Sequence, residues 1–447
     1  MDLRGKRALV VGLGRSGVAA TELLAEKGAV VQTTDLKMPD EGTLARLRAW
    51  GAEFKLQTPE VFAGAELIVL SPGVPADLEP LAEARRRGVS VIGEVELASW
   101  FLQGPVIGVT GSNGKTTTTA LIGHILQECG IPAQVGGNIG VPASALVRGS
   151  RPEQWNVLEL SSFQLETIQR FRARIAVGLN VSPDHLDRHR SFENYVAQKA
   201  RLFETQQDSD HAVLNADDAL CLAWARRTRA AVHRFSLRSG AAEACYDGRR
   251  LWLAGEVLMP GEEVPLRGLH NLENTLAAAL VAWLAGASHQ AIAAAVRTFP
   301  GVEHRLEFVA RVRGVDFYND SKATNVDAAL KALAAFQSPL WVILGGKDKD
   351  SDYGPLREPL RRKARAALLI GAAAEKIAAQ LTDAVPLLRC GTLEAAVAEA
   401  WKRAQPGETV LLTPACASFD QFENFEHRGR VFKQLVAALA QASGEEV

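Results

Sequence analysis

The chain has 447 residues, which predicts about three domains at the usual domain size of roughly 150 residues. Hydrophobic residues make up 47% and charged residues 23% of the sequence, which excludes a disordered, collagen-like or coiled-coil chain. The 50 basic and 51 acidic residues give a formal net charge of −1, so there is no global basic field for nucleic acid or an anionic membrane.

Five cysteines are scattered singly, a pattern that fits a reducing cytosol better than a disulfide framework or a zinc site. The first apolar run ends at Gly12, too early for a signal peptide. The alanine-rich stretch 274–289 is shorter than the ~18 apolar residues of a membrane-spanning helix. We therefore expect a cytoplasmic protein with no membrane insertion and no nucleic-acid partner.

Residues 1–93 alternate short apolar runs with helical patterns, which predicts a first domain with a parallel sheet and right-handed crossovers. The predicted strands are 7–11, 29–35, 67–71 and 89–92. A glycine-rich turn, Gly12-Leu-Gly-Arg-Ser-Gly17, follows the first strand, and Asp35 ends the second.

This arrangement is the dinucleotide fingerprint, in which glycines let a diphosphate approach a helix N-terminus and the acid takes a ribose hydroxyl. The same geometry would hold the diphosphate of UDP, and a purely structural turn is the bland alternative. Ser71-Pro-Gly73 ends another strand, where a second phosphate contact would fall.

Residues 94–300 form the predicted second domain, which begins with the strand 106–110 and a helix at 116–129. Further buried strands are predicted at 157–160, 175–180 and 212–215, and Asp247-Gly248 indicates an antiparallel hairpin. Two alanine-rich helices follow before Pro300-Gly301 breaks the pattern.

The turn Gly111-Ser-Asn-Gly-Lys-Thr116 joins the strand 106–110 to its helix, so its backbone amides and the helix dipole can cradle phosphates. Lys115 would neutralise phosphate charge, and the Thr116 hydroxyl would reach Mg²⁺. The strict P-loop has glycine at the position of Val109, so this turn is a variant and does not imply an ordinary P-loop NTPase.

Glu159 lies inside an otherwise apolar strand, where an unpaired carboxylate would cost several kcal/mol, so it needs a cation. It is a candidate Mg²⁺ ligand, with a structural pair to an arginine as the alternative. His185 follows the strand 175–180, and Lys199 projects from the helix that begins after Ser191. Spacing alone does not separate a functional role for either from a structural histidine or a solvated lysine.

Residues 301–447 form the predicted third domain, with strands at 315–318, 340–344, 367–370 and 410–413. Helices are predicted around 326–336, 373–381, 392–404 and 428–442. Polar turns follow three of the strands, at 319–325, 345–349 and 417–420, and predict one binding crevice at the carboxyl edge of a sheet. Only 14 of the 50 basic residues are lysine, yet Lys115, Lys199, Lys322 and Lys349 fall inside the motifs, which favours roles that need an ammonium or an amine.

The motifs together resemble those of the Mur ligases over nearly the whole chain. They are GSNGKTTT (111–118), ELSSFQLE (159–166), NVSPDHLDRH (180–189), YVAQK (195–199), HN (270–271), EHR (303–305), NDSKATN (319–325) and ACASFDQFENFEHRG (415–429). The last two, with the dinucleotide-like first domain, are most similar to the members that add D-glutamate.

The resemblance implies an α/β fold of three domains, each a mostly parallel sheet flanked by helices. The first would be Rossmann-like and bind the UDP-sugar, the second a P-loop-type ATPase, and the third Rossmann-like, for nucleotide and amino acid. It also implies an ADP-forming ligase of peptidoglycan synthesis, acting as a monomer. ATP would phosphorylate the L-alanine carboxylate of UDP-MurNAc-L-alanine, and the amine of D-glutamate would attack the acyl phosphate.

The same resemblance implies the site residues. Catalytic roles fall to Lys115, Glu159, His185 and Lys199. Two Mg²⁺ ions would be held by Thr116, Glu159, His185 and Lys199, with Lys199 as its CO₂ adduct, a carbamate. ATP would contact Gly111, Ser112, Asn113, Gly114, Lys115, Thr116, Thr117, Asn271, Arg305 and Asp320. The UDP-sugar would contact Gly14, Arg15, Ser16, Asp35, Leu36, Ser71, Gly73 and Asn138. D-Glutamate would contact Lys322, Thr324, Lys349, Ser418, Phe419 and Phe425.

The chain departs from the family pattern at two places. Arg15-Ser16 and Leu36-Lys37 stand in the uridine-binding turns, where familiar members carry a hydroxyl and an arginine. Lys347-Asp348 replaces the more usual Asp-Gly before Lys349.

Three alternative functions fit parts of the sequence. Among other amide ligases of the superfamily, the diaminopimelate enzyme is disfavoured because the third domain has no Asp-Asn-Pro-Arg stretch, and the folylpolyglutamate enzyme because a complete UDP-type domain precedes the ATP turn; the L-alanine enzyme is a further sibling. An NAD-dependent dehydrogenase would leave Lys115, Glu159 and the third domain without a role. An inactive binding module is disfavoured because every expected ligand type is present.

Overall fold

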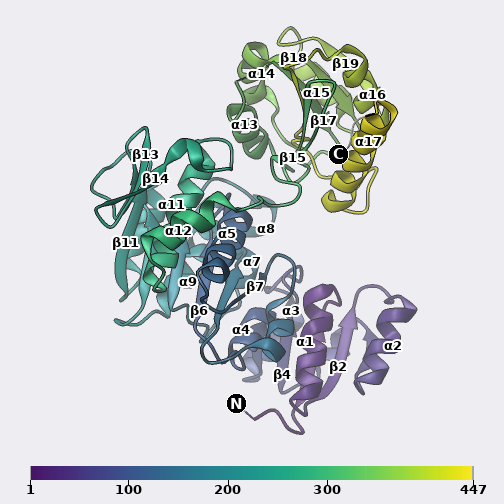
Figure 1. Cartoon of the computed structure of the whole chain (residues 1–447). Coiled ribbons are helices and arrows are strands. Elements are labelled where there is room, and N and C mark those ends of the chain that lie inside the picture. The colour runs from purple at the N-terminus through teal and green to yellow at the C-terminus, as the bar shows by residue number, and fades with distance from the viewer. Residues whose placement is uncertain (1, 338, 445–447) are drawn as a thin grey trace. The chain divides into compact units, whose positions relative to one another are not determined.

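The computed structural model describes residues 2–337 and 339–444. The chain forms two compact units, one made of residues 1–263 with 273–299, the other of 264–272 with the chain from Pro300 onward. Three sheets flanked by helices are present, two in the first unit and one in the second, which confirms the predicted α/β architecture (Figure 1). The domain boundaries at 93 and 300 remain predictions.

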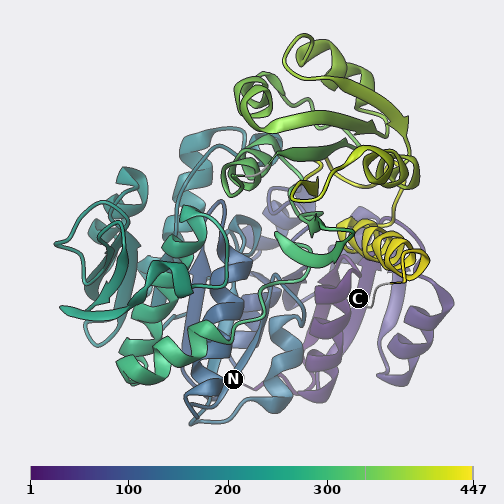
Figure 2. The same ribbon diagram turned by 45° about the horizontal axis from the view of Figure 1, so that its top comes forward.

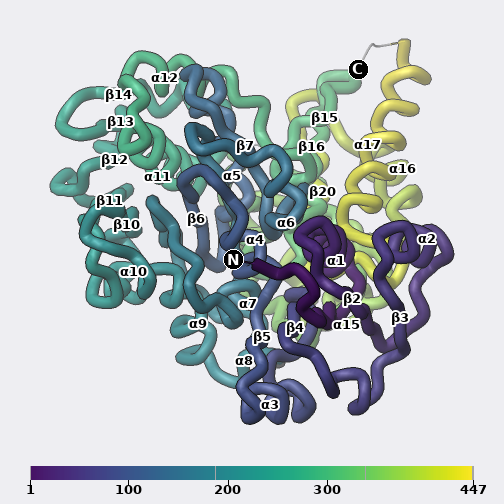
Figure 3. Tube along the Cα trace, turned by 90° about the horizontal axis from the view of Figure 1, so that it is seen from below, coloured from purple at the N-terminus to yellow at the C-terminus, as the bar shows by residue number. Residues whose placement is uncertain are grey.

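The first sheet has five parallel strands in the order β3-β2-β1-β4-β5. They are β1 (Arg7–Val11), β2 (Val30–Asp35), β3 (Glu53–Leu56), β4 (Leu67–Leu70) and β5 (Ser90–Gly93). Figure 3 shows α1 (Arg15–Glu26) and α2 (Glu41–Ala49) on one side of the strands and α3 (Glu79–Arg86) on the other, and the two apolar cores agree. A short 3₁₀ helix, η1 (Pro59–Phe62), covers the same face as α3.

The second sheet has nine strands in the order β14-β13-β12-β11-β10-β9-β6-β8-β7. They are β6 (Val106–Thr110), β7 (Ala133–Gly137), β8 (Trp155–Glu159), β9 (Ile175–Gly178), β10 (His211–Asn215), β11 (Ala231–Ser236), β12 (Ala244–Tyr246), β13 (Arg250–Leu253) and β14 (Glu256–Pro260). The strands from β7 to β12 are parallel, and β12, β13 and β14 form the predicted antiparallel insertion. Strand β6 lies between β8 and β9, so the chain adds later strands on both sides of β6. Ligands of open α/β sheets bind at the carboxyl ends of strands at such a switch point.

The helices of the second sheet belong to the first unit, except that the first turn of α11, residues 269–272, belongs to the second unit. They are α4 (Glu94–Ser99), α5 (Lys115–Glu128), α6 (Ala143–Leu146), α7 (Ser162–Leu165), α8 (Leu186–His189), α9 (Phe192–Glu204), α10 (Ala219–Ala223), α11 (Leu269–Leu284) and α12 (His289–Arg297), with the 3₁₀ turns η2 (Val147–Gly149), η3 (Trp224–Arg226) and η4 (Gly261–Glu263). Helix α12 packs on α5, where His124 Nε2 lies 3.0 Å from the Ala295 carbonyl oxygen.

The first two sheets share one apolar core through α1, α4 and α6. Buried carboxylates reinforce this contact: Glu96 accepts hydrogen bonds from the backbone amides of residues 169–171 and from the Trp100 indole. Glu94 accepts one from the Ser144 amide in α6. Within this unit, helix α4 therefore joins the two sheets by packing and by hydrogen bonds.

The third sheet has six strands in the order β15-β16-β20-β17-β18-β19, parallel except for the β15–β16 pair. They are β15 (Glu307–Val312), β16 (Val315–Asn319), β17 (Leu340–Gly345), β18 (Ala364–Ile370), β19 (Leu387–Gly391) and β20 (Thr409–Leu412). One face packs on α13 (Val326–Ala334), α14 (Arg357–Lys363) and α15 (Ala374–Gln380), and the other on α16 (Leu393–Arg403) and α17 (Phe425–Ala442) (Figure 2). A 3₁₀ turn, η5 (Gly354–Leu356), precedes α14. No helix in the described part of the chain is long and apolar enough to span a membrane.

Candidate active site

The turn at residues 111–116, the phosphate turn, lies where the sequence predicts it, between β6 and the start of α5. Gly114 has φ 83°, and a Cβ there would lie 2.3 Å from the Asn274 side-chain oxygen, so the position requires glycine. The Asn113 amide donates to Asn180 Oδ1 (2.9 Å), and Asn180 Nδ2 donates back to the Asn113 carbonyl (3.1 Å). A side chain beyond the end of β9 thus holds the turn that follows β6.

Two lysines converge on one carbonyl of this turn. The ammonium nitrogens of Lys115 and Lys199 lie 2.9 and 2.8 Å from the Gly111 carbonyl oxygen. Lys199 is buried, and this burial together with the nearby Lys115 lowers the pKa of Lys199 well below its usual 10.5, against the opposing pull of Asp184 and Glu159. The turn therefore offers two adjacent cationic side chains, one of which readily gives up its proton.

Glu159 ends β8 with its carboxylate buried. Its Oε1 accepts a hydrogen bond from Asn138 Nδ2 (2.7 Å), but its Oε2 has no hydrogen-bond partner. In the described part of the chain no arginine pairs with Glu159, contrary to the structural alternative. A buried carboxylate oxygen left without a donor fits a cation that the site binds.

No three His, Cys, Asp or Glu side chains gather into a metal cluster among the residues that the structure describes. Mg²⁺ bound with a nucleotide needs few protein ligands, because phosphates and waters complete its coordination. Glu159 and the buried Thr116 hydroxyl suit such an ion.

His185 lies at the carboxyl edge of the second sheet with 46% of its side chain exposed. Its ring contacts Phe163 edge-on at 4.9 Å, and its Nε2 lies 3.6 Å from Asp184. The neighbouring His189 is buried instead, stacked on Phe163 and 2.9 Å from the Ser162 hydroxyl. The predicted role of His185 stays a prediction.

Tyr195 belongs to the site, although it was not singled out in the sequence. Its hydroxyl lies 3.0 Å from Ser112 Oγ in the phosphate turn, and the Lys199 ammonium lies 4.6 Å from its ring centroid. Burial raises the pKa of Tyr195, so the phenol stays protonated. The spacing of four residues between Tyr195 and Lys199 on α9 was the available signal, because such residues share a helix face.

A cavity of about 600 Å³ lies beside the carboxyl edge of the first sheet. All eight residues predicted to contact a UDP-sugar line it: Gly14, Arg15, Ser16, Asp35, Leu36, Ser71, Gly73 and Asn138. Gln57, Leu78 and Gln164 line it as well and were not predicted, since only the fold brings them there.

The glycine-rich turn is built for close approach at this cavity. A Cβ on Gly17 would lie 1.8 Å from the Gly12 carbonyl oxygen, which accepts a hydrogen bond from Ser71 Oγ (2.8 Å). Asp35 Oδ2 accepts from the Leu13 amide (2.6 Å), so the turn and the acid that ends β2 are held together. Asn138 lines the cavity and donates a hydrogen bond to Glu159. Because Glu159 pairs with Val109 at the end of β6, the cavity lies next to the phosphate turn.

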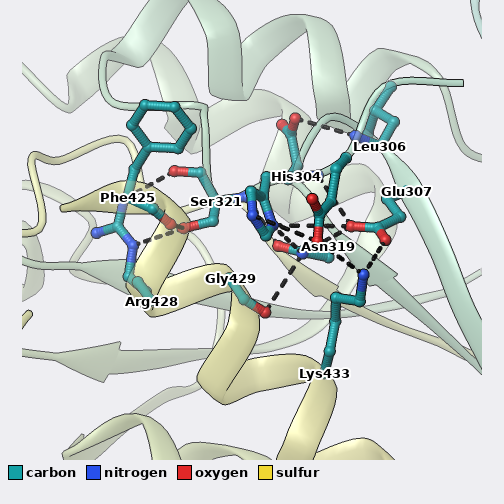
Figure 4. A network of polar contacts seen from close by, with 11 residues as sticks. His304, Leu306, Glu307, Asn319, Ser321, Phe425, Arg428, Gly429 and Lys433 are labelled. Atoms are coloured by element: carbon teal, nitrogen blue, oxygen red, sulfur yellow. Dashed lines mark hydrogen bonds and ion pairs between the residues drawn. The ribbon is translucent and has the colours of Figure 1, made fainter. Parts of the chain in front are cut away.

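The second unit gathers the three predicted polar turns, because β16, β20 and β17 are neighbours in the sheet. The buried Arg428 joins two of them. Its Nε and Nη2 donate to the Ser321 hydroxyl and carbonyl (both 2.9 Å; Figure 4). Its Nη2 and Nη1 also donate to the carbonyls of Cys416 (3.2 Å) and Ala417 (3.3 Å). Arginine on a helix surface is usually solvated, so no local sequence pattern distinguishes Arg428.

A second part of the network holds the end of β16 (Figure 4). Asn319 Nδ2 donates to Glu307 Oε2 (3.0 Å) and lies 2.9 Å from His304 Nδ1, and the Lys433 ammonium lies 2.6 Å from Glu307 Oε1. Asp320, the next residue, accepts hydrogen bonds from the Leu306 amide and the Thr413 hydroxyl. Burial raises the pKa of Asp320 to about 7, although Arg305 opposes the shift.

The remaining predicted residues of the second unit differ in exposure. Asn271 is buried and donates to the Arg267 carbonyl, and Arg305 carries a buried Nε without a hydrogen-bond partner. The Lys322 ammonium lies 5.6 Å from the Phe425 ring centroid, and Ser418 is buried. Lys349 and Phe419 are exposed, and Thr324 is half-buried in the turn before α13. The structure thus brings most of these residues to the carboxyl edge of the third sheet.

Sequence and structure comparisons agree with this geometry. Three family models match: "Mur ligase MurD-like, N-terminal domain" at 6–93, "Mur ligase middle domain" at 109–282 and "Mur ligase, glutamate ligase domain" at 304–416. The UDP-N-acetylmuramoylalanine–D-glutamate ligase of Solibacter usitatus is 63% identical, covering 98% of this chain and 99% of that protein. The enzyme of the same name from Acidobacterium capsulatum is 51% identical, covering 98% and 97%.

Solved structures show the same fold at low identity. The MurF ligase of Thermotoga maritima in complex with ADP has a TM-score of 0.64 at 15% identity, covering 98% of this chain and 96% of that one. The UDP-N-acetylmuramate-alanine ligase MurC of the same organism has a TM-score of 0.62 at 18% identity, covering 97% and 99%. The three matched domains and the full-length relatives show that this chain belongs to the Mur ligase family.

Proposed function

We propose that this chain is an ADP-forming ligase that joins D-glutamate to UDP-N-acetylmuramoyl-L-alanine through an acyl phosphate, in peptidoglycan precursor synthesis. The observation that carries the proposal is the link through Asn138, which lines the cavity and whose side chain donates to Glu159. Glu159 ends β8 beside the turn whose Gly111 carbonyl both Lys115 and Lys199 contact. A UDP-sugar in the cavity can thereby present its acyl end to the phosphate turn. The relatives that are 63% and 51% identical carry the name of this activity.

The residues of the first unit explain how two anions could react. A carboxylate and a triphosphate repel each other, and a carboxylate is a poor acyl donor until it is phosphorylated. The amides of the phosphate turn and the Lys115 ammonium would hold the triphosphate and withdraw its charge. Mg²⁺, when bound by Thr116 and Glu159, would supply the remaining charge neutralisation.

The second unit would supply the other contacts. Asn271, Arg305 and Asp320 would hold the nucleotide, and the D-glutamate contacts would come from Lys322, Thr324, Lys349, Ser418, Phe419 and Phe425. Cationic side chains among these suit an amino acid that brings two carboxylates. Expulsion of phosphate from the tetrahedral intermediate would complete the amide.

The test is phosphate release from ATP in the presence of UDP-MurNAc-L-alanine and one amino acid at a time. We expect release with D-glutamate and not with L-glutamate, L-alanine or meso-diaminopimelate. Release that ignored chirality, or that preferred another amine, would overturn the assignment. For the first sheet, UDP-sugar binding without NADH binding is expected, and tight saturation by NADH would favour a dehydrogenase instead.

We further propose that Lys199 forms a carbamate with CO₂ and that this carbamate and His185 bind a second Mg²⁺. The support is a buried amine with a lowered pKa and no ion-paired carboxylate in the described part of the chain, since the neutral amine is the form that adds CO₂. Lys199→Arg should abolish turnover although the charge is kept, because guanidinium does not carry CO₂. Lys199→Ala should regain part of its activity with added acetate, whereas near-normal turnover of Lys199→Arg would refute the role.

The place of action proposed is the cytoplasm, and the acting form a monomer. All five cysteines are free thiols, as a reducing compartment would leave them. Light scattering during gel filtration tests the second point, and a mass near twice 48.1 kDa would contradict it.

A further inference from the structure

The loop after β17 carries Lys349 and is held at its base by the neighbouring strand end. The Lys347 amide donates to the Ala417 carbonyl (2.8 Å), and the Ala417 amide donates back to Lys347 (3.2 Å). Gly346 permits this approach, because a Cβ there would lie 2.2 Å from the Ala417 carbonyl oxygen. The turn that carries Ser418 and the loop that carries Lys349 therefore share a backbone bridge.

Asp348 fixes the middle of the same loop from three directions. Its Oδ1 accepts hydrogen bonds from the Tyr353 hydroxyl (2.8 Å) and the Ser351 amide (3.1 Å), and its Oδ2 accepts one from the Lys376 ammonium (2.7 Å). Tyr353 is fully buried, and Lys376 belongs to α15, which packs against β17 and β18 (Figure 1). Burial opposes ionisation, but these donors outweigh it and hold the pKa of Asp348 at about 2.

Asp348 therefore stays charged next to Lys349, and Lys376 is the cation that compensates it. A glycine at this position, as in the more usual Asp-Gly sequence, would make none of these three side-chain contacts. The loop of this chain is thus anchored by an ion pair that spans 28 residues of sequence. Asp350, at φ 59°, is the second acceptor for the Lys376 ammonium (3.1 Å) and continues the same anchor.

We propose that Asp348 and Lys376 are positioning residues for the amine substrate. Their ion pair fixes the loop that presents Lys349, and it cancels a negative charge that would otherwise repel an acidic amino acid. The pair thereby sets the affinity for that substrate without touching the reacting atoms. This inference rests on the proposed function, since it takes Lys349 as a contact of the amino acid.

The experiment measures KM for each of the three substrates separately, with the other two saturating. Lys376→Met should raise KM for D-glutamate by about tenfold while KM for ATP and for UDP-MurNAc-L-alanine changes by less than about twofold. Lys376→Arg should stay within about threefold of the wild type, because the ion pair is kept. Glu375→Gln is the matched control, since this exposed residue of α15 pairs with Arg389 and does not contact the loop.

A second variant keeps the test decisive if Lys376→Met unfolds. Asp348→Asn keeps an acceptor for Tyr353 but loses the charge, and it should raise KM for D-glutamate by about threefold. In the double variant Asp348→Asn/Lys376→Met the uncompensated charge is gone, so KM should fall below that of Lys376→Met. Unchanged KM for D-glutamate in both single variants, or an equal rise for all three substrates, would overturn the inference.

Failure of the proposed function gives a different result. In that case the wild type would release phosphate with another amine, or with none. If another amine is used, its KM in Lys376→Met decides the inference: a selective rise for an acidic amine supports it, and no rise refutes it.

Discussion

Buried charges are satisfied differently beside the phosphate turn and in the second unit of this protein. Beside the phosphate turn, Glu159 keeps an oxygen without a partner, and Lys199 contacts a carbonyl while another ammonium lies close by. In the second unit, Arg428 donates to four acceptors, and Asp320 accepts from a hydroxyl and an amide. Glu159 thus keeps an unfilled position beside the phosphate turn, whereas protein groups satisfy Arg428 and Asp320 in the second unit.

The difference shows which buried charges serve binding and which serve folding. A charge whose partners are all protein groups stabilises the loops that supply them, and its removal leaves those groups without donors. A charge with an unfilled position costs stability and is kept for a ligand. Replacing a buried charge that has an unfilled position by a neutral residue should therefore reduce activity, whereas replacing one that protein groups satisfy should reduce stability.

Glu159→Gln should have the largest effect, and on the reaction alone. We expect kcat/KM to fall about 10³-fold, or ~4 kcal/mol, because the substitution removes the anionic oxygen available to Mg²⁺. Stability should be unchanged or higher, because Gln still accepts from Asn138 and the burial cost of the charge is gone. The checks are phosphate release at varied Mg²⁺ and urea unfolding. Loss of stability together with normal turnover would reverse the comparison.

Arg428→Met should affect folding first. Three backbone carbonyls and the Ser321 hydroxyl would each lose a hydrogen bond from the guanidinium, which should cost about 3 kcal/mol of unfolding free energy. Arg430→Met is the control on the same helix, since Arg430 is exposed and its loss should cost less than about 0.5 kcal/mol. Equal unfolding curves for both variants would show that the network does not hold the loops.

Glu94 sharpens the comparison through pH. Burial raises the pKa of Glu94 to about 7, against a usual value of 4.5, so the folded chain keeps a proton that the unfolded chain loses. The stability from this proton is complete below pH 4.5 and is lost as pH rises through 7. Relative to the wild type, Glu94→Gln should therefore gain on the order of 2 kcal/mol between pH 4.5 and 8.

Asp320→Asn in the second unit should likewise gain stability relative to the wild type as pH rises, because burial raises the pKa of Asp320 to about 7 from 3.8. Urea unfolding at several pH values checks both variants. A difference from the wild type that does not change with pH would contradict the account.

Arg148→Ala should have the smallest effect. Arg148 is exposed and pairs with Glu22 and Glu26 of α1, so water competes for the charges and the loss should stay below about 1 kcal/mol. Thermal unfolding in low and high salt checks this value. A larger loss would mean that surface pairs, rather than the shared core, hold α1 against the second sheet.

The sequence predicted what repeats along the chain and missed what depends on distant contacts. Short apolar runs located β1, β6 and β20, and the glycine-rich turn after β1 located the cavity. The binding crevice at the three polar turns of the second unit stays a prediction. Charged or partly exposed strands such as β3 (Glu-Phe-Lys-Leu) and β19 have no apolar run and were not predicted.

Buried charges were the second class of omission. Nothing in the local pattern distinguishes Glu94, Glu96 or Arg428 from solvated side chains, because their partners lie 11–107 residues away or on another element. Glu159 was an exception, because it interrupts an apolar strand. Roles that came from the resemblance, such as those of His185 and Lys199, were placed near the phosphate turn but await the experiments above.

Asn138 connects the cavity of the first unit to the buried carboxylate of Glu159. Asn138 lines the cavity, and its side-chain amide donates to Glu159 Oε1. A cavity occupant that captures this N–H releases a carboxylate oxygen, which strengthens the attraction of Glu159 for a divalent ion. If Glu159 binds such an ion, thermodynamic reciprocity would make the ion tighten the binding of the occupant by the same factor, and the two sites would then fill cooperatively.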